Sequence, residues 1–392
     1  MSSATAALKR IWAGHKAVVI AVPAIVVIAA IVGGLLLVNA SNGTPQATAS
    51  PIAEASVVLP TESPTPEITP SPTPYMSPTP TPMPSGWAYS DLDGVAAPSG
   101  MAHRIPIAVM IDDQVAARPQ SGVSSASIVY QAPADGDQDR YMLVFQEGVA
   151  TSVGPVRSTR TYYVTWASEY HAVLGHFGGD SISLKVLLPA AQKAKTIYNM
   201  DSLKYHQDCP YHRIKTRPAP HNAYTTSQLM WECAGYLKYP QTIQTTVNRP
   251  FRDNTPTAQL PASQVISIVY RTGKVGYEFN RPSDSYLRLV SGKYEIDPAT
   301  GGHVHASDII VMYQTKSISP YSEAGHSRPD IATVGSGKAL IFQEGKEIVG
   351  TWKKKNSSAL TRFYDQAGNE IPLVRGEIFI QSIPTSYAVT VK

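Results

Sequence analysis

The first hydrophobic pattern along the chain is an uninterrupted apolar run over residues 17–38, which contains no charged side chain. About 20 apolar residues are enough to cross a bilayer as a helix. Lys9, Arg10 and Lys16 precede the run, and positive charge on that side predicts a cytoplasmic tail over 1–16 and an extracytoplasmic remainder. The pattern therefore predicts one transmembrane helix from Ala17 to Val38, with the membrane as its partner.

The alternative for this run is a cleaved signal peptide, because Val38, Asn39 and Ala40 form an acceptable small-residue cleavage site. The apolar region of a signal peptide usually spans about 7 to 15 residues. The run here has 22 residues, which favours the uncleaved helix. Both interpretations place the rest of the chain outside the cytoplasm.

Hydrophobic periodicity is absent between residues 41 and 85, where the chain is rich in Pro, Thr and Ser and contains twelve prolines. Proline fixes φ and lacks an amide hydrogen, so this composition favours an extended, polyproline-like segment without a core. We predict a disordered linker that acts as a spacer, with O-glycosylation as an alternative role.

Between residues 100 and 250 the pattern mixes two periodicities. Continuous apolar runs over 105–111 and 172–177 predict buried strands, the second ending at two glycines. Ser158 is placed to cap a helix that carries aromatic residues at helical spacing. Further helices are predicted over 181–195 and 226–237. This part is predicted to be a mixed α/β domain.

From residue 260 to residue 392 helical periodicity disappears, and short strand-like runs remain. Turn pairs such as Ser291–Gly292 and Glu344–Gly345 separate them, which is typical of hairpins. This part is predicted to be an antiparallel β-rich domain. The boundary between the two domains is expected in 248–262, which has three prolines and no apolar periodicity. The predicted fold class is α+β.

Charge is distributed unevenly, with +3 over 1–16, −5 over 17–103 and +6 over 104–392, for a net charge of +4. An excess of six positive charges over so long a segment is not a basic patch, which excludes nucleic-acid binding on charge alone. Complete motifs for dinucleotide binding, zinc hydrolases or serine hydrolases are absent from the sequence. We therefore predict no cofactor.

Cys209 and Cys233 are the two cysteines of the chain, and both follow the predicted membrane span. Disulfides persist outside the cytoplasm, so a bridge between them is the favoured interpretation. Two free buried thiols are one alternative. A metal site with His206, His212 and His221 is another, although the spacing lacks the paired motifs typical of zinc, and we predict no metal.

Polar residues at the predicted ends of strands are candidates for a functional site. Asp112 and Asp113 follow the run over 105–111, at the end of a strand where α/β sheets often bind ligands. Adjacent side chains of a strand point in opposite directions, so only one of them would enter a cleft. The alternative is that both cap a loop.

Arg157 and Arg160 flank the first turn of the helix predicted from Ser158. The helix dipole already favours negative charge at that position, so two cations there predict a bound anion. The anion is either an internal carboxylate such as Asp112 or the phosphate or carboxylate of a ligand.

Two histidines add to these candidates. His176 ends a strand beside Gly178 and Gly179, and His221 with Asn222 lies in a proline-stiffened loop. Each histidine alone is more often structural, but together with Asp112 and Arg157 they could line one polar cleft. The basic run 353–355 is predicted to be a solvated hairpin tip.

Several of these stretches resemble the YerB-like family of bacterial extracytoplasmic proteins. The similar segments are 107–112, 116–122, 154–160, 176–179, 219–222, 334–339, 350–354 and 363–365. The resemblance implies an α+β fold in two parts and no known function. It adds Arg118 to the candidate ligand-binding residues, which are then Asp112, Arg118, Arg157, Arg160, His176, Gly178, Gly179, His221 and Asn222.

The chain departs from that family in two ways. The family consists of lipoproteins, yet no cysteine precedes Cys209, so the predicted helix would take over the anchoring. The family tends to carry glutamate in the pattern that reads Val129, Tyr130, Gln131, Ala132 here, and a Gly-Gly motif after it where this chain has 136–140. Any mechanism that requires this glutamate is in doubt for this chain.

These observations predict an envelope protein that binds an anionic envelope ligand. A hydrolase or transferase acting on cell-wall material is the alternative, with Asp112 as acid or base and His176 or His221 as its partner. A scaffold for other envelope proteins is the third. Convergence of the arginines, histidines and Asp112 on one concave site would favour binding or catalysis over the scaffold.

Overall fold

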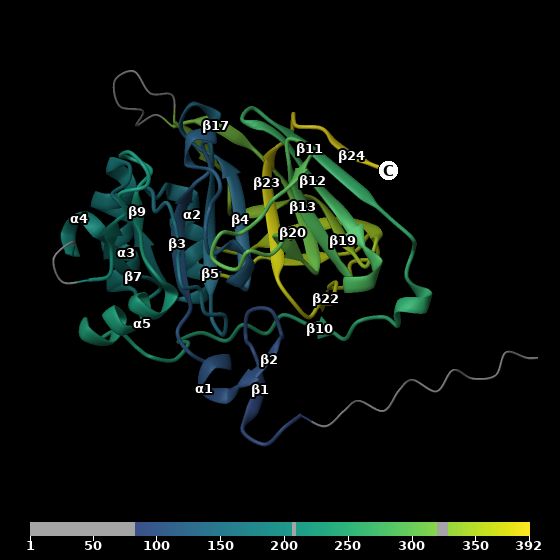
Figure 1. Ribbon diagram of the computed structural model, residues 1–392, viewed down its shortest axis with the longest axis horizontal. Coiled ribbons are helices and arrows are strands. Elements are labelled where there is room, and N and C mark those ends of the chain that lie inside the picture. Colours follow the sequence, from purple (N-terminus) through teal and green to yellow (C-terminus); the bar gives the residue numbers. More distant parts are fainter. Residues whose placement is uncertain (1–82, 206–208, 320–327) are drawn as a thin grey trace, which may run out of the picture. The chain divides into compact units, whose positions relative to one another are not determined.

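The computed structural model describes residues 83–205, 209–319 and 328–392 (Figure 1). The predicted membrane span 17–38 and nearly all of the predicted linker 41–85 lie outside these residues. Within the described ranges, no helix combines the length and the apolar character needed to cross a bilayer. The described residues all belong to one compact unit.

A ten-stranded sheet contains strands from both halves of the chain, and Figure 1 shows β4 beside β23. Its order is β21-β20-β19-β16-β23-β4-β5-β3-β6-β7. The strands of the first half are β3 (Ile107–Asp112), β4 (Ile128–Pro133), β5 (Asp139–Phe145), β6 (Val173–His176) and β7 (Tyr198–Asp201). Those of the second half are β16 (Asp308–Gln314), β19 (Gly335–Gln343), β20 (Lys346–Lys354), β21 (Arg362–Tyr364) and β23 (Ile378–Pro384).

The two halves join where β23 pairs in parallel with β4 on one side and with β16 on the other. The second half is therefore β-rich but not wholly antiparallel, in contrast to the prediction. Turn pairs predict only hairpins, and parallel neighbours come from distant segments that leave no local signal. A domain boundary in 248–262 stays a prediction, although the sheet itself continues from one half into the other.

A second, antiparallel sheet lies in the C-terminal half, as the short strand-like runs and the turn pairs between them predict. Its strands are β11 (Val265–Tyr270), β12 (Gly273–Asn280), β13 (Ser285–Val290), β14 (Lys293–Tyr294), β15 (His305–Ala306) and β24 (Val389–Val391). Both residues of the Ser291–Gly292 turn and of the Glu344–Gly345 turn have positive φ, which explains the glycine at the second position.

Side chains alternate between two hydrophobic layers along the central strands. Ile107, Val109 and Ile111 face one core, which also contains residues of α5 (Ser227–Tyr236) and of the second sheet. Ala108 and Met110 face the other core, which contains the aromatic residues of α2 (Thr161–Ala167). Burial on both faces accounts for the continuous apolar runs of these strands.

The remaining elements are short. The helices are α1 (Ser99–Ala102), α3 (Leu188–Lys193) and α4 (Ser202–Tyr205), and a π-helical turn, Ser183–Leu187, precedes α3. The strands are β1 (Trp87–Tyr89), β2 (Ala96–Pro98), β8 (His212–Arg213), β9 (Ala223–Tyr224), β10 (Phe251–Arg252), β17 (Lys316–Ile318), β18 (Pro329–Ile331) and β22 (Leu373–Val374).

Two local predictions are wrong. Ser158 does not cap a helix: α2 begins at Thr161, its N-cap residue is Arg160, and the Ser158 carbonyl accepts a hydrogen bond from Arg140 (2.8 Å). The run 353–355 is only in part solvated, because β20 extends to Lys354 and the Lys354 side chain is fully buried, whereas Lys353 and Lys355 are exposed. In both cases a partner distant in sequence decides the local structure.

The disulfide is confirmed, since Cys209 and Cys233 are bridged with their Cα atoms 5.5 Å apart. The bridge ties the segment before β8 to α5 and thereby fixes both ends of a loop that carries His221 and Asn222. The metal site with these cysteines is excluded, because a bridged thiol is not a ligand. Within the described ranges, no group of three or more His, Cys, Asp or Glu is arranged to bind a metal.

Removing this bridge is expected to lower the free energy of unfolding by about 3 kcal/mol, because it closes a loop of 24 residues. The change is Cys209→Ser with Cys233→Ser, and thermal unfolding with and without reductant is the measurement. Reductant should destabilise the native chain and leave the double variant unaffected. Recovery of two alkylated cysteines from unreduced native protein would contradict this.

Candidate functional site

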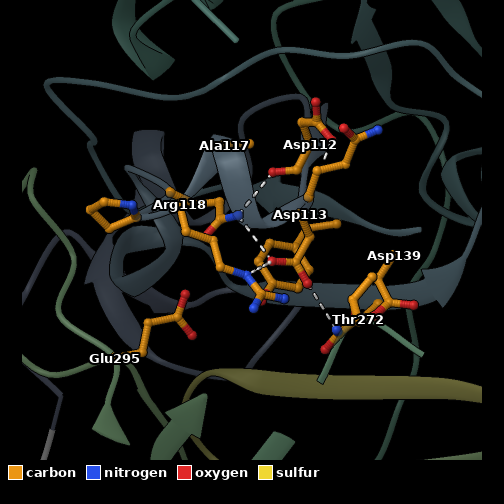
Figure 2. A network of polar contacts seen from close by, with 12 residues as sticks. Asp112, Asp113, Ala117, Arg118, Asp139, Thr272 and Glu295 are labelled. Atoms are coloured by element: carbon orange, nitrogen blue, oxygen red, sulfur yellow. Dashed lines mark hydrogen bonds and ion pairs between the residues drawn. The ribbon is translucent and has the colours of Figure 1, made fainter. Parts of the chain in front are cut away.

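Asp112 and Asp113 leave the end of β3 on opposite sides, as alternation along a strand predicts. Asp112 contacts Arg157 and His221, whereas Asp113 contacts Arg118. In Figure 2 the Asp113 carboxylate points toward Arg118, and dashed lines mark its bonds. Both carboxylates are fully buried, so each side of the strand end has its own polar cluster.

The first cluster consists of Asp112, Arg157 and His221. Asp112 Oδ2 lies 2.9 Å from His221 Nδ1 and 3.2 Å from Arg157 Nε, and Oδ1 accepts a bond from the Gln114 amide (3.3 Å). The His221 side chain is 11% exposed and that of Arg157 is 25% exposed. A buried carboxylate therefore orients two side chains that reach the surface.

Backbone hydrogen bonds hold the three segments of this cluster together. The Asp112 amide donates to the Pro155 carbonyl (2.9 Å), and the Arg157 amide donates to the Met110 carbonyl (2.8 Å). The Val156 amide donates to the Ala223 carbonyl (2.7 Å), next to the loop with His221. The position of each side chain is thus fixed by the sheet rather than by a mobile loop.

His176 does not join this cluster. It is fully buried, and both ring nitrogens have partners, Nδ1 at 2.8 Å from the Gly178 carbonyl and Nε2 at 2.7 Å from Asn199 Oδ1. Gly178 has a φ of 67°, a conformation that favours glycine, and its amide donates to Asp201 (3.0 Å). His176 and Gly178 therefore organise the turn after β6. Gly179 serves the same turn, because a Cβ there would lie 3.0 Å from Thr159.

Arg160 belongs to a separate ion pair. Its Nε donates to Asp135 Oδ1 (2.9 Å), and a second nitrogen contacts the other oxygen. Burial opposes ionisation of Asp135, but the hydrogen bond and charge of Arg160 lower its pKa overall. Arg140 lies near the same carboxylate, and burial together with Arg160 lowers the Arg140 pKa to about 10. Each arginine of the predicted pair thus has an internal carboxylate, and that of Arg160 is Asp135 rather than Asp112.

The second cluster lies between the two sheets and includes Arg118. Asp113 accepts bonds from Arg118 (3.0 Å), Gln120 (2.9 Å) and Gln131 (3.1 Å). Burial raises the pKa of Asp113, although Arg118 opposes this. Gln131 also accepts a bond from buried Arg288 (2.9 Å). An amide can donate on one side and accept on the other, which gives glutamine at this position a structural role.

A pocket of about 420 Å³ is formed by segments that are connected to the first cluster through the backbone. Its lining residues are Phe177, Ser202, Leu203, Tyr211, His212, Arg213 and Ala223. The Phe177 amide donates to the Arg157 carbonyl (3.0 Å), and Ala223 follows His221 by two residues. The pocket and the Asp112 cluster therefore share the same backbone segments.

Arg213 is the residue of this site that the sequence does not single out. Its guanidinium lies 4.9 Å from the Phe177 ring centroid, and it donates to Asn222 Oδ1 (2.6 Å). Ser202 is buried, and its hydroxyl has no hydrogen-bond partner in the part of the chain that the structure describes. The feature of the sequence that indicates Arg213 is a run of basic residues after Cys209 without an acid, namely His212, Arg213, Lys215 and Arg217.

The chain belongs to the family described as "Protein of unknown function (DUF3048)". The N-terminal domain of that family matches residues 92–239 and the C-terminal domain matches residues 266–380. The predicted resemblance is thereby confirmed.

Two comparisons identify a relative within this family. The chain is 28% identical over 306 residues to the "Putative lipoprotein YerB" of Bacillus subtilis (strain 168), covering 76% of this chain and 87% of the relative. The crystal structure of the YerB protein from Bacillus subtilis matches with a TM-score of 0.66 at 26% identity, over 77% of this chain and 99% of that one. The mixed fold with its large β content is therefore that of YerB.

Proposed function

We propose that this chain is a membrane-anchored extracytoplasmic protein whose folded part binds an anionic envelope ligand in the pocket beside Arg213 and Arg157. The predicted apolar span 17–38 supports the anchoring, as does the name of the relative, "Putative lipoprotein YerB". The observation that carries the binding proposal is the pocket of about 420 Å³, with an apolar wall and a cationic rim.

The rim carries the positive charge of Arg213, from the loop after Cys209. His212 and Arg213 line the pocket, and Arg157 lies one backbone hydrogen bond away from Phe177. Arg157 pairs with Asp112 through Nε, and its side chain is 25% exposed. Guanidinium groups bind carboxylates and phosphates through pairs of N–H groups, so both arginines suit an anion.

The wall of the pocket indicates the rest of the ligand. Phe177, Leu203, Tyr211 and Ala223 provide apolar and aromatic surface. The unpartnered hydroxyl of Ser202 provides one polar contact. A ligand with a carboxylate or phosphate and an adjoining apolar portion fits this combination.

Acid–base catalysis is the second candidate, and the Asp112–His221 hydrogen bond of 2.9 Å favours it. A buried carboxylate that orients a histidine is the arrangement in which histidine acts as a general base. The His221 ring has no second hydrogen bond among the described residues. No serine or tyrosine hydroxyl is bonded to the ring in that part of the chain, and both cysteines are bridged, so a nucleophile is not identified and binding is favoured.

Arg213→Glu is expected to weaken ligand binding at least tenfold, about 1.4 kcal/mol, because it reverses the charge of the rim. The probe is a set of purified carboxylate-bearing muropeptides, titrated calorimetrically against the full chain in detergent. Lys274→Glu is the matched control, since it makes the same charge change at an exposed position of β12, which is not among the lining residues of the pocket. Equal affinity of the two variants, or no binding to the native chain, would contradict the proposal.

A further inference from the structure

A second cavity, of about 600 Å³, lies where the ends of β20 and β21 meet the segment 245–248. Four cations line it, Lys353, Lys354, Lys355 and Arg362, together with one carboxylate, Glu169. It shares no lining residue with the pocket beside Arg213. The function proposed above makes no use of it.

Two of the four cations are neutralised within the protein. Lys354 Nζ lies 2.8 Å from Glu169 Oε1, and both side chains are fully buried. Glu169 also accepts bonds from the Thr361 amide (2.8 Å) and hydroxyl (2.7 Å). Burial lowers the pKa of Lys354, against the effect of Glu169. Arg362 pairs with Glu370 (2.6 Å), so both of these cations are structural.

The other two cations are not neutralised. Lys353 is exposed and its ammonium lies 4.5 Å from the ring centroid of Tyr364, a contact that orients the side chain without cancelling its charge. Lys355 is exposed and has no hydrogen bond or ion pair among the described residues. Two lysines separated by one residue therefore present unpaired charge at the cavity.

A buried arginine next to a lining residue adds to this positive potential. Arg249 is 6% exposed and follows Asn248, which lines the cavity. It donates to the Thr361 carbonyl (3.3 Å), while its Nε and one terminal nitrogen have no hydrogen-bond partner in the described part of the chain. No carboxylate lies within ion-pair distance of it among those residues. Its charge strengthens the attraction for an anion.

The neutral lining is rich in hydroxyl and amide groups, namely Thr245, Thr246, Asn248, Ser336 and Ser358. Such groups both donate and accept hydrogen bonds, as the hydroxyls of a sugar require. Ala359, Leu360 and Tyr364 supply the apolar part of the lining, and the face of Tyr364 is already in contact with Lys353. This composition fits a hydroxylated anion better than an aromatic or lipidic one.

We propose that this cavity is a second ligand site, which binds a phosphorylated sugar with its phosphate on Lys353 and Lys355 and its hydroxyls on the threonine, serine and asparagine side chains. The site combines one end of β20 with a segment from the N-terminal half of the chain.

The test is calorimetric titration of the full chain in detergent with glucose 6-phosphate, glucose and inorganic phosphate. We expect saturable binding of glucose 6-phosphate, weaker binding of inorganic phosphate, and weakening of the former at high salt. Lys353→Met with Lys355→Met should reduce its affinity at least tenfold, since methionine keeps the stem and removes the charge. Lys274→Met with Lys293→Met is the control, because both lysines are exposed and lie outside the cavity lining.

Each remaining outcome overturns part or all of the proposal. Failure of glucose 6-phosphate to bind the native chain at millimolar concentration, or equal affinity of the two double variants, would overturn the site. Inorganic phosphate binding as tightly as the sugar phosphate would overturn the role of the hydroxyl groups. Thermal unfolding of both double variants separates loss of binding from loss of fold. Arg213→Glu should leave glucose 6-phosphate binding unchanged, which keeps this test independent of the first pocket.

Discussion

Arg288→Ala is expected to lower the free energy of unfolding by about 3 to 5 kcal/mol, because it leaves buried carboxylates without their cation. Arg288 is fully buried on β13 and lies 2.6 Å from Glu295 Oε2. It also donates to Tyr141 (2.6 Å) and to Gln131 (2.9 Å), which belong to strands of the ten-stranded sheet. The same side chain therefore joins the two sheets.

Denaturant unfolding of the full chain in detergent measures this effect. Arg271→Ala is the control, since the Arg271 side chain is 68% exposed and lies 3.9 Å from Asp137. An exposed pair of this kind contributes about 0 to 1 kcal/mol. If both variants lost the same stability, the buried cluster would contribute no more to the free energy of unfolding than an exposed ion pair.

Asp139→Asn is expected to flatten the decline of stability between pH 4 and pH 8. Burial, reinforced by the nearby charge of Asp113, raises the pKa of Asp139 from 3.8 to about 8. The folded chain then keeps its proton over a range in which the unfolded chain has lost it. The stability that the protonated Asp139 carboxyl contributes is therefore complete at low pH and is lost as the pH rises to 8.

The size of this effect is on the order of 5 kcal/mol at most at pH 8, given about 1.4 kcal/mol for each pH unit of the interval. Unfolding free energies of the native chain and of Asp139→Asn, measured at pH 5 and at pH 8, provide the test. The variant should lose less stability than the native chain. Burial raises the pKa of Asp308 to about 7, and Asp308 contributes a similar pH dependence of stability to both proteins. The difference between the two proteins therefore isolates Asp139. Parallel curves would show that Asp139 titrates normally.

Local patterns predict the strands and helices of this chain well, because burial on one or both faces dictates their periodicity. The runs over 105–111 and 172–177 end within one residue of the ends of β3 and β6, and Thr226 caps α5 by accepting a bond from the Leu229 amide (3.0 Å). The order of the strands in the ten-stranded sheet cannot be predicted from local patterns. Nothing in residues 128–133 or 378–384 indicates that the two segments pair, because both are simply apolar.

The candidate site residues lie in different clusters of the fold for the same reason. Asp112, Arg157 and His221 meet in one cluster, whereas Arg160 and His176 have other partners. A sequence shows that an arginine needs an anion, but Asp112 and Asp135 are equivalent until the fold places them. Arg213 is indicated only by the run of cations after Cys209, which does not show which of them lines a pocket. The chemical need of each residue can be predicted from the sequence, but which residues lie close together cannot.

The position of β23 has a consequence for how the chain reaches its folded state. This strand, residues 378–384, lies between β4 and β16, yet it is synthesised after every other strand of the ten-stranded sheet. Until it arrives, β4 and β16 each present an unpaired edge, the kind of edge that associates with other chains. A chain exported from its N-terminus onward would thus close this sheet only after residues 378–384 had crossed the membrane. Deletion of residues 378–384 would remove the strand that joins the two halves.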